Sequence, residues 1–214
     1  MINLYFWNTP NGYKPLLLLE EAHIDYQLHP VNIGAEQQFR SEFLKISPNN
    51  KIPAITDTEI SVDGRPLRLF ESGAILLYLA EKSGQFLNTD ASQRAETLQW
   101  LFWQVGGVGP IFGQSFHFSL SASQHIDYAV DRFVNETSRL LSVLDWRLND
   151  REFVAGNYSI ADMALYPWVV EHPSLSIKIN DYANVSRWLD LISQRPTVKR
   201  AYQIGQQVRA AAAA

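Results

Sequence analysis

The stretch WNTPNGYK, residues 7–14, lies between two apolar runs, INLYF and PLLLLEEA. This pattern is typical of a strand that turns into a helix. The first turn of a helix presents N–H groups without intrahelical partners and a partial positive charge, which favour chemistry on an anion. The turn contains no cysteine, histidine or serine, and the nearby hydroxyls belong to Thr9, Tyr13 and Tyr5. The sequence therefore predicts a reaction site without an obvious protein nucleophile.

A second candidate feature is NNKIPAI, residues 49–55, in which a proline opens an expected strand. Proline cannot donate a hydrogen bond to a sheet, so it belongs at a strand start or at an edge. If the Ile52–Pro53 peptide bond is cis, the N–H and C=O of Ile52 are exposed, and an extended peptide can pair with them. An ordinary strand-entry proline is the alternative, and composition alone favours it.

Glu71 and Ser72 stand at the expected start of a helix in LFESGAILLYLAEK. The N–H groups of that helix start suit a ligand carboxylate, which Ser72 would hold through its hydroxyl and its backbone. Glu71 would hold a ligand ammonium. The alternative is structural: Ser72 caps the helix, Glu71 is a capping acid, and Gly84 ends the helix.

Other polar features predict structure rather than chemistry. Ser159 and Asp162 in NYSIADMAL form a variant capping box, which is a folding signal. Arg132 is expected to be a solvated surface arginine. The five histidines lack the spacing of metal ligands, and GGVGP, residues 106–110, is expected to be a kink rather than a phosphate cradle.

The composition narrows the class of protein. The chain has 214 residues, of which 46% are apolar and 19% charged, so it can bury a core. The net charge of −4 gives no reason to expect nucleic acid or an anionic membrane as a partner. The absence of cysteine excludes disulfides, Cys-ligated metals and a cysteine nucleophile. Without a secretory signal or an apolar run long enough to span a bilayer, we expect a cytoplasmic protein.

Elements of two kinds must position these residues. The first eighty-odd residues predict the order β-α-β-α-β-β-α, with elements at 2–6, 15–22, 25–33, 39–46, 52–57, 67–70 and 71–84. A polar linker follows, and then only helical patterns, at 95–105, 126–148, from 157 onward and at 185–194. This order predicts an α/β thioredoxin-like N-terminal domain over residues 1–84 and an all-α C-terminal domain over residues 92–207.

Three motifs in this order, NKIPAI, ESGAILLYLAEK and NYSIADMALYPW, closely resemble those of the cytosolic glutathione transferases. The resemblance covers about residues 1–205. The stretches TPNGYK, QFRSEFLKISPNNKIPAI and TLQWLFWQVGGVGP are similar to the bacterial nu class. The resemblance implies the glutathione transferase fold, a homodimer, glutathione bound in the first domain and an apolar co-substrate site against the second.

The resemblance also implies roles for individual positions. Ile52, before a cis Pro53, would pair through its backbone with the cysteinyl part of glutathione, and Glu71 and Ser72 would hold the γ-glutamyl end. The other implied contacts are Gln38 and Lys51 with the glycyl end, Thr9 and Asn11 with the sulfur, and Arg132 with a second glutathione or a bound disulfide.

The chain departs from the wider family at the turn, where common classes offer a tyrosine, serine or cysteine to the thiolate. Here the turn offers Thr9 and Asn11, while Tyr5 is expected to lie too deep in its strand. An asparagine amide can donate to a thiolate but cannot take its proton. A hydrogen bond and the positive end of the first helix would then lower the thiol pKa. We favour Asn11, with Thr9 next, as the residue that faces the sulfur of glutathione.

Three functions are compatible with these residues. The first is a glutathione-dependent disulfide-bond reductase, in which bound glutathione, reduced or oxidised, brings the nucleophile. The second is a conventional transferase or peroxidase for electrophiles or organic hydroperoxides. The third is a non-catalytic glutathione-binding regulatory protein. All three take glutathione as ligand and need no metal, and the two enzymes also take a small disulfide or an electrophile. An apolar pocket for the transferase would use aromatic residues, although core positions explain them better: Trp100, Phe102, Trp103, Phe112, Phe116 and Phe118.

Overall fold

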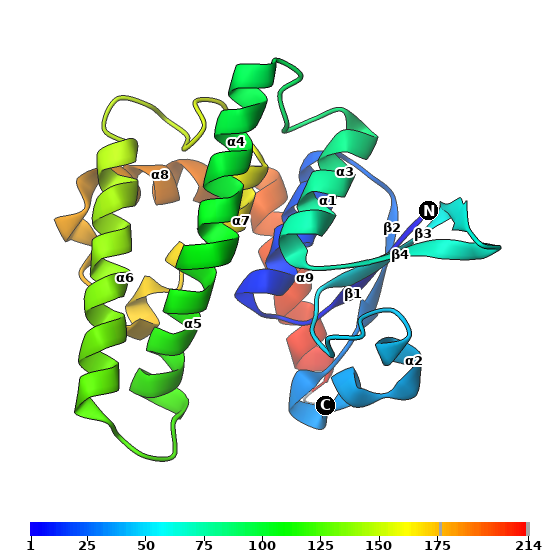
Figure 1. Ribbon diagram of the computed structural model, residues 1–214, viewed down its shortest axis with the longest axis horizontal. Helices are drawn as coiled ribbons and strands as arrows, with labels where there is room; N and C mark the ends of the chain where they lie inside the picture. The colour runs from blue at the N-terminus through cyan, green and yellow to red at the C-terminus, as the bar shows by residue number, and fades with distance from the viewer. Residues whose placement is uncertain (176, 213–214) are drawn as a thin grey trace. The chain divides into compact units, whose positions relative to one another are not determined.

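The computed structural model describes residues 1–175 and 177–212, which fall into two compact units (Figure 1). The first unit comprises Met1–Gln85 together with Arg195–Ala214, and the second comprises Phe86–Gln194. The C-terminal residues are thus grouped in space with the N-terminal ones. The domain boundaries 1–84 and 92–207 stay a prediction.

A four-stranded mixed sheet forms the centre of the first unit, in the order β2-β1-β3-β4. The strands are β1 (Ile2–Phe6), β2 (Tyr26–Pro30), β3 (Ala54–Val62) and β4 (Arg65–Phe70). Strand β1 is parallel to β2 and antiparallel to β3, and β3 is antiparallel to β4. With the helices in between, this is the thioredoxin-like arrangement that the sequence predicts.

Helices cover both faces of this sheet, as Figure 1 shows for α1 (Pro10–Glu21), α3 (Ser72–Ser83) and the short α2 (Ser41–Leu44). The side chains of β1 alternate accordingly, because successive residues of a strand point to opposite faces. Phe6 is buried and meets Tyr13 of α1 edge-on at 5.6 Å. Tyr5 points the other way and packs against His29 and against Phe43 of α2, with ring centroids 5.1 and 6.0 Å away.

The first unit also contains α9 (Pro196–Ala211), which the sequence analysis missed. The last helical pattern of the sequence analysis stops at residue 194, two residues before Pro196, but proline is also favoured at the first position of a new helix. The helix packs along α1, where the rings of Tyr202 and Tyr13 stack at 4.2 Å. Arg195 donates two hydrogen bonds, of 2.6 and 2.7 Å, to the buried carboxylate of Glu21.

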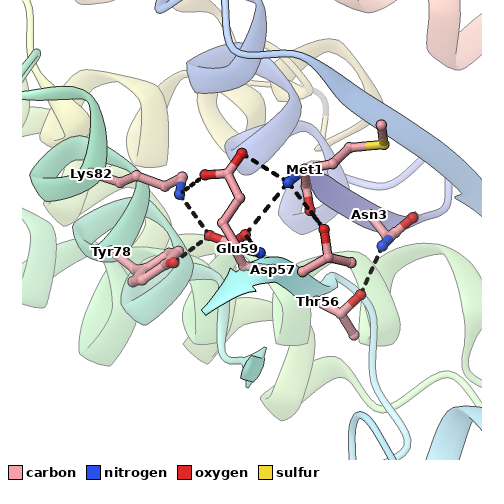
Figure 2. A network of polar contacts seen from close by, with 8 residues as sticks. Met1, Asn3, Thr56, Asp57, Glu59, Tyr78 and Lys82 are labelled. Carbon is pink, nitrogen blue, oxygen red and sulfur yellow. Dashed lines mark hydrogen bonds and ion pairs between the residues drawn. The ribbon is translucent and has the colours of Figure 1, made fainter. Parts of the chain in front are cut away.

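A buried carboxylate fastens α3 to the sheet (Figure 2). Asp57 of β3 is fully buried and accepts a hydrogen bond of 2.6 Å from the hydroxyl of Tyr78, while the ammonium of Lys82 lies 2.9 Å away. The Lys82 ammonium also lies 2.6 Å from the carboxylate of Glu59. Burial by itself would raise the pKa of Asp57, but the hydrogen bonds from Tyr78 and Lys82 together hold that pKa below its usual value.

The second unit is helical. Its α-helices are α4 (Ala91–Trp103), α5 (Gly109–Phe116), α6 (Asp127–Arg147), α7 (Ile160–Val169) and α8 (Ala183–Ser193). The glycine-rich GGVGP stretch enters a π-helical turn, Gln104–Val108, that joins α4 to α5. Trp100 and Phe112 belong to the buried core, whereas Phe102 is exposed. Helix α5 is an addition to the helices that the sequence predicts.

The capping box at the start of α7 is confirmed. The Ser159 hydroxyl accepts the N–H of Ala161, and the Asp162 carboxylate accepts the N–H of Ser159. Asp162 also accepts the backbone N–H of Val154 at 3.0 Å and the indole N–H of Trp188 at 2.9 Å. Burial raises the pKa of this carboxyl to about 6, although the donors oppose that rise. The pair therefore organises the fold, as the sequence indicates.

Within the described ranges, no helix combines the length and the apolar character that crossing a bilayer requires.

Candidate functional site

The turn after β1 is the first part of the site. Helix α1 begins at Pro10, five residues earlier than the sequence analysis expected, because Thr9 is its N-cap and Pro10 takes the first helical position. The Thr9 hydroxyl accepts the N–H of Gly12 at 3.2 Å. Position 12 requires a glycine, because a Cβ there would lie 2.2 Å from the carbonyl oxygen of Trp7. Asn11 thus stands in the first turn of α1, at its positive end.

A hollow in the first unit has Asn11 in its wall. Three segments surround it: the start of α1, the loop before β3, and the junction between β4 and α3. Its lining residues are Asn11, Ser47, Lys51, Ile52, Pro53, Phe70, Glu71 and Ser72. We call it the Asn11 hollow. Six of the nine site residues that the sequence analysis names are therefore brought together.

The loop before β3 presents backbone groups to the Asn11 hollow. The Ile52–Pro53 peptide bond is cis. Strand β3 begins only at Ala54, so the N–H and C=O of Ile52 lie outside the sheet ladder. The buried hydroxyl of Ser47 donates a hydrogen bond of 2.8 Å to the carbonyl of Lys51 and holds the loop. This loop is thus shaped to offer the Ile52 backbone to an extended peptide.

Glu71 and Ser72 line the hollow at the start of α3, where neither side chain caps the helix. Glu71 is the N-cap residue of α3, and its side chain makes no capping hydrogen bond. Ser72 is the first helical residue, so the expectation that Ser72 caps the helix is wrong, whereas Gly84 does end it in a left-handed conformation. The reason is that the chain enters α3 directly from β4, and Glu71 makes the turn at a φ of 72°. The Glu71 carboxylate is therefore exposed beside the hollow.

Sequence reasoning missed Lys14, which lies behind Ser72. Only 2% of Lys14 is exposed, and its ammonium donates a hydrogen bond of 3.2 Å to the hydroxyl of Ser72. Burial lowers the pKa of Lys14 to about 7, although the nearby carboxylate of Glu71 opposes this shift. A lysine directly before the apolar run of α1 was the signal in the sequence. Ser47 and Phe70 were also missed, since neither residue type stands out in a loop or a strand end.

Three of the predicted site residues lie outside the Asn11 hollow. Thr9 is engaged as the cap of α1. Gln38 lies in the 3-10 turn Gln37–Phe39, and its buried side-chain oxygen accepts no hydrogen bond from the residues that the structure describes. Arg132 lies on α6 of the second unit, where it lines a separate hollow with Tyr128, Phe133 and other residues.

Metal chemistry has no candidate ligands among the described residues, since no three His, Asp or Glu side chains there are grouped to hold an ion. The Asn11 hollow instead combines an amide donor, a helix start, open backbone groups and both signs of charge. Such a set suits an extended zwitterionic peptide whose polar ends are held apart.

Comparison with known proteins agrees with this geometry. Residues 1–81 match the family model described as "Glutathione S-transferase, N-terminal domain", and residues 110–196 match "Glutathione S-transferase, C-terminal domain". The chain is 54% identical over 202 residues to the disulfide-bond oxidoreductase YfcG of Escherichia coli K12, and the match covers 94% of each protein.

Solved structures of similar proteins contain glutathione. A glutathione transferase from Pseudomonas putida, 44% identical, superimposes with a TM-score of 0.88 over 94% of this chain and 90% of that one, and it has one glutathione disulfide bound per subunit. A family member from Pseudomonas fluorescens Pf-5, also 44% identical, has a TM-score of 0.89 over 94% of this chain and 91% of its own, with two glutathione molecules bound.

Proposed function

This chain belongs to the glutathione S-transferase family, and we propose that it is a glutathione-dependent disulfide-bond reductase. One observation carries the proposal: a chain without cysteine surrounds a helix start and the Asn11 amide with groups suited to a peptide. The name of YfcG and the glutathione disulfide in the Pseudomonas putida relative support the choice of reaction.

Each residue of the Asn11 hollow has a role in this proposal. The Asn11 amide donates to the thiolate of glutathione, and the positive end of α1 stabilises the same charge. The Ile52 backbone, next to Pro53, pairs with the cysteinyl residue. Glu71 holds the ammonium of the γ-glutamyl end, and Ser72 holds its carboxylate.

Contacts beyond this set complete the proposed binding. Lys51, together with Gln38, pairs with the glycyl carboxylate. Thr9 supports the sulfur site through the start of α1. Arg132 contacts a second glutathione or a bound disulfide.

The reaction balances without a protein thiol. One glutathione thiolate attacks a sulfur of the substrate disulfide, which breaks the S–S bond and releases one thiolate that takes up a proton. A second glutathione thiolate attacks the resulting mixed disulfide and releases the other half. Two glutathiones are thereby oxidised to glutathione disulfide, and one substrate disulfide is reduced to two thiols.

A substrate comparison tests the proposal. We expect turnover of 2-hydroxyethyl disulfide with glutathione well above the uncatalysed exchange, and only weak turnover of a chloro-nitrobenzene. The reverse ranking would favour the conventional transferase or peroxidase. Glutathione binding without either activity would favour the regulatory protein.

Assembly and location extend the proposal. The family membership supports a homodimer of the nu class, and the composition supports a cytoplasmic location. Light scattering of the purified chain at micromolar concentration should give about twice the mass of 24.4 kDa; a monomer would contradict the assembly.

A further inference from the structure

Lys14 is unusual because a lysine is almost never this deeply buried unless its charge is paired or hydrogen-bonded. It stands one turn into α1, between the turn that carries Asn11 and the apolar stretch that packs on the sheet. Its side chain reaches α3, where its ammonium donates to the Ser72 hydroxyl at 3.2 Å. Ser72 itself lines the Asn11 hollow, so Lys14 approaches the hollow from the protein side.

This hydrogen bond fixes the direction in which Ser72 can donate. A lysine ammonium has three donors and no acceptor, so the Ser72 oxygen must accept. The hydroxyl proton of Ser72 then points elsewhere and is available to a ligand oxygen. The same start of α3 supplies backbone N–H groups that favour an anion.

The charges around Lys14 also favour an anion beside Ser72. The carboxylate that faces Lys14 is that of Glu71, which raises the pKa of the lysine against the effect of burial. The carboxylates at the other end of α1 are engaged elsewhere: Glu21 pairs with Arg195, and Glu20 pairs with Arg200. A ligand carboxylate beside Ser72 would therefore meet a buried positive charge.

We propose that Lys14 is a positioning residue for the carboxylate of the γ-glutamyl end: by donating to Ser72, it directs the Ser72 hydroxyl to that carboxylate and places a cation behind it. The inference rests on the proposed binding of glutathione in the Asn11 hollow. Lys14, although buried, would thereby help the site to prefer ligands that have the γ-glutamyl carboxylate.

Two ligands separate this role from a structural one. S-methylglutathione has no thiol to titrate or react, and its analogue with γ-aminobutyrate in place of γ-glutamate lacks only the carboxylate in question. By isothermal titration calorimetry, wild-type protein should bind S-methylglutathione more tightly. Lys14→Met should raise the dissociation constant of S-methylglutathione about tenfold to a hundredfold, which is the range expected for a hydrogen bond to a charged group. The same substitution should change the dissociation constant of the analogue by no more than about twofold.

A matched lysine provides the control. Lys51 lines the same hollow but is assigned to the glycyl end, so Lys51→Met should weaken both ligands by the same factor. In a Ser72→Ala background, Lys14→Met should cost clearly less than in the wild type, because the two residues act together. The inference would be overturned if Lys14→Met lowered the affinity for both ligands equally. It would also be overturned if Lys14→Met cost as much affinity in the Ser72→Ala background as in the wild type. If wild-type protein bound neither ligand, the proposed function itself would fail.

Wild-type protein offers a test that needs no variant. Because the pKa of Lys14 is lowered to about 7, its positive charge is lost as the pH rises above neutrality, while carboxyl groups stay ionised. A bound carboxylate moves this loss to higher pH. The preference for S-methylglutathione over the analogue should therefore narrow between pH 6 and about pH 9. A preference that stays constant over that range would contradict the inference.

Discussion

At the scale of single residues, the chain has no cysteine and the turn after β1 has no histidine or carboxylate, so we propose that it acts on the thiol of glutathione through hydrogen bonds and charge. The Asn11 amide is a donor that cannot accept the thiol proton. In the proposed function it would therefore shift the equilibrium toward the thiolate instead of taking part in a proton relay. Asn11 lines the hollow, whereas Thr9, whose hydroxyl accepts the N–H of Gly12 at the start of α1, does not.

Asn11→Ala should lower kcat/KM for glutathione-dependent reduction of 2-hydroxyethyl disulfide by about tenfold to a hundredfold, because one hydrogen bond to a charged sulfur is lost. The pH–rate profile should also shift to higher pH, because the thiol loses part of its stabilisation. Steady-state kinetics at several pH values measure both effects. Asn149→Ala, which changes an exposed asparagine of the second unit, serves as the control and should keep wild-type rates. Equal rates for both variants would show that the turn does not act through Asn11.

At the scale of elements, the hollow depends on how α3 is held against the sheet. Tyr78 and Lys82 reach from α3 to the buried Asp57 of β3, as Figure 2 shows. The same helix begins with Ser72 at the hollow. A buried polar contact thus helps to hold the helix whose first residue, Ser72, lines the hollow.

Lys82→Met should lower the free energy of unfolding by about 2 kcal/mol at pH 7, because the buried Asp57 carboxylate loses a charged partner. The pKa of Asp57 in the folded protein lies below its ordinary value of 3.8. The stabilisation is therefore present above that pH and is lost as the pH falls through the lowered pKa. Urea unfolding of wild type and variant should differ at pH 7, and the difference should shrink only as the pH falls below about 4. Lys45→Met, at an exposed lysine of the same unit, should unfold like the wild type; a Lys82→Met difference that persisted in acid would contradict the assignment to Asp57.

Elements with strong local signals were predicted correctly from the sequence, and those set by distant contacts were not. The strands and the capping box at Ser159 follow from patterns of a few residues, whereas the cis bond before Pro53 was implied by the resemblance, since composition alone favours an ordinary strand-entry proline. The start of α1 was misplaced because Pro10 and Gly12 look like turn residues, although they serve here at a helix N-terminus and a close backbone contact. The role of Lys14 depends on a residue 58 positions away, which no local pattern contains.

At the scale of the whole molecule, the first unit is assembled from the two ends of the chain. Helix α9 packs along α1, and the contact is close because Gly205 faces Tyr13. A Cβ at position 205 would lie 2.1 Å from the Tyr13 hydroxyl oxygen. The C-terminal helix is thereby linked to the helix that carries Asn11 and Lys14.

Gly205→Ala should lower the free energy of unfolding by about 1–3 kcal/mol, because the tyrosine ring must move out of its stack with Tyr202. Denaturant unfolding measures this loss. Gly106→Ala is the matched control: its Cβ would meet no atom within 4 Å, so it should be neutral or slightly stabilising. A loss of stability no larger for Gly205→Ala than for Gly106→Ala would show that α9 tolerates a wider spacing from α1.

The central claim is that the protein, which has no cysteine, activates the thiol of bound glutathione. The most direct measurement is the pKa of the glutathione thiol while bound, followed by the ultraviolet absorbance of the thiolate as the pH is raised. The account predicts a pKa at least about one unit below the ordinary thiol value of ~8.5, with most of that shift lost in Asn11→Ala. A bound thiol that titrates like free glutathione in the wild-type protein would contradict it.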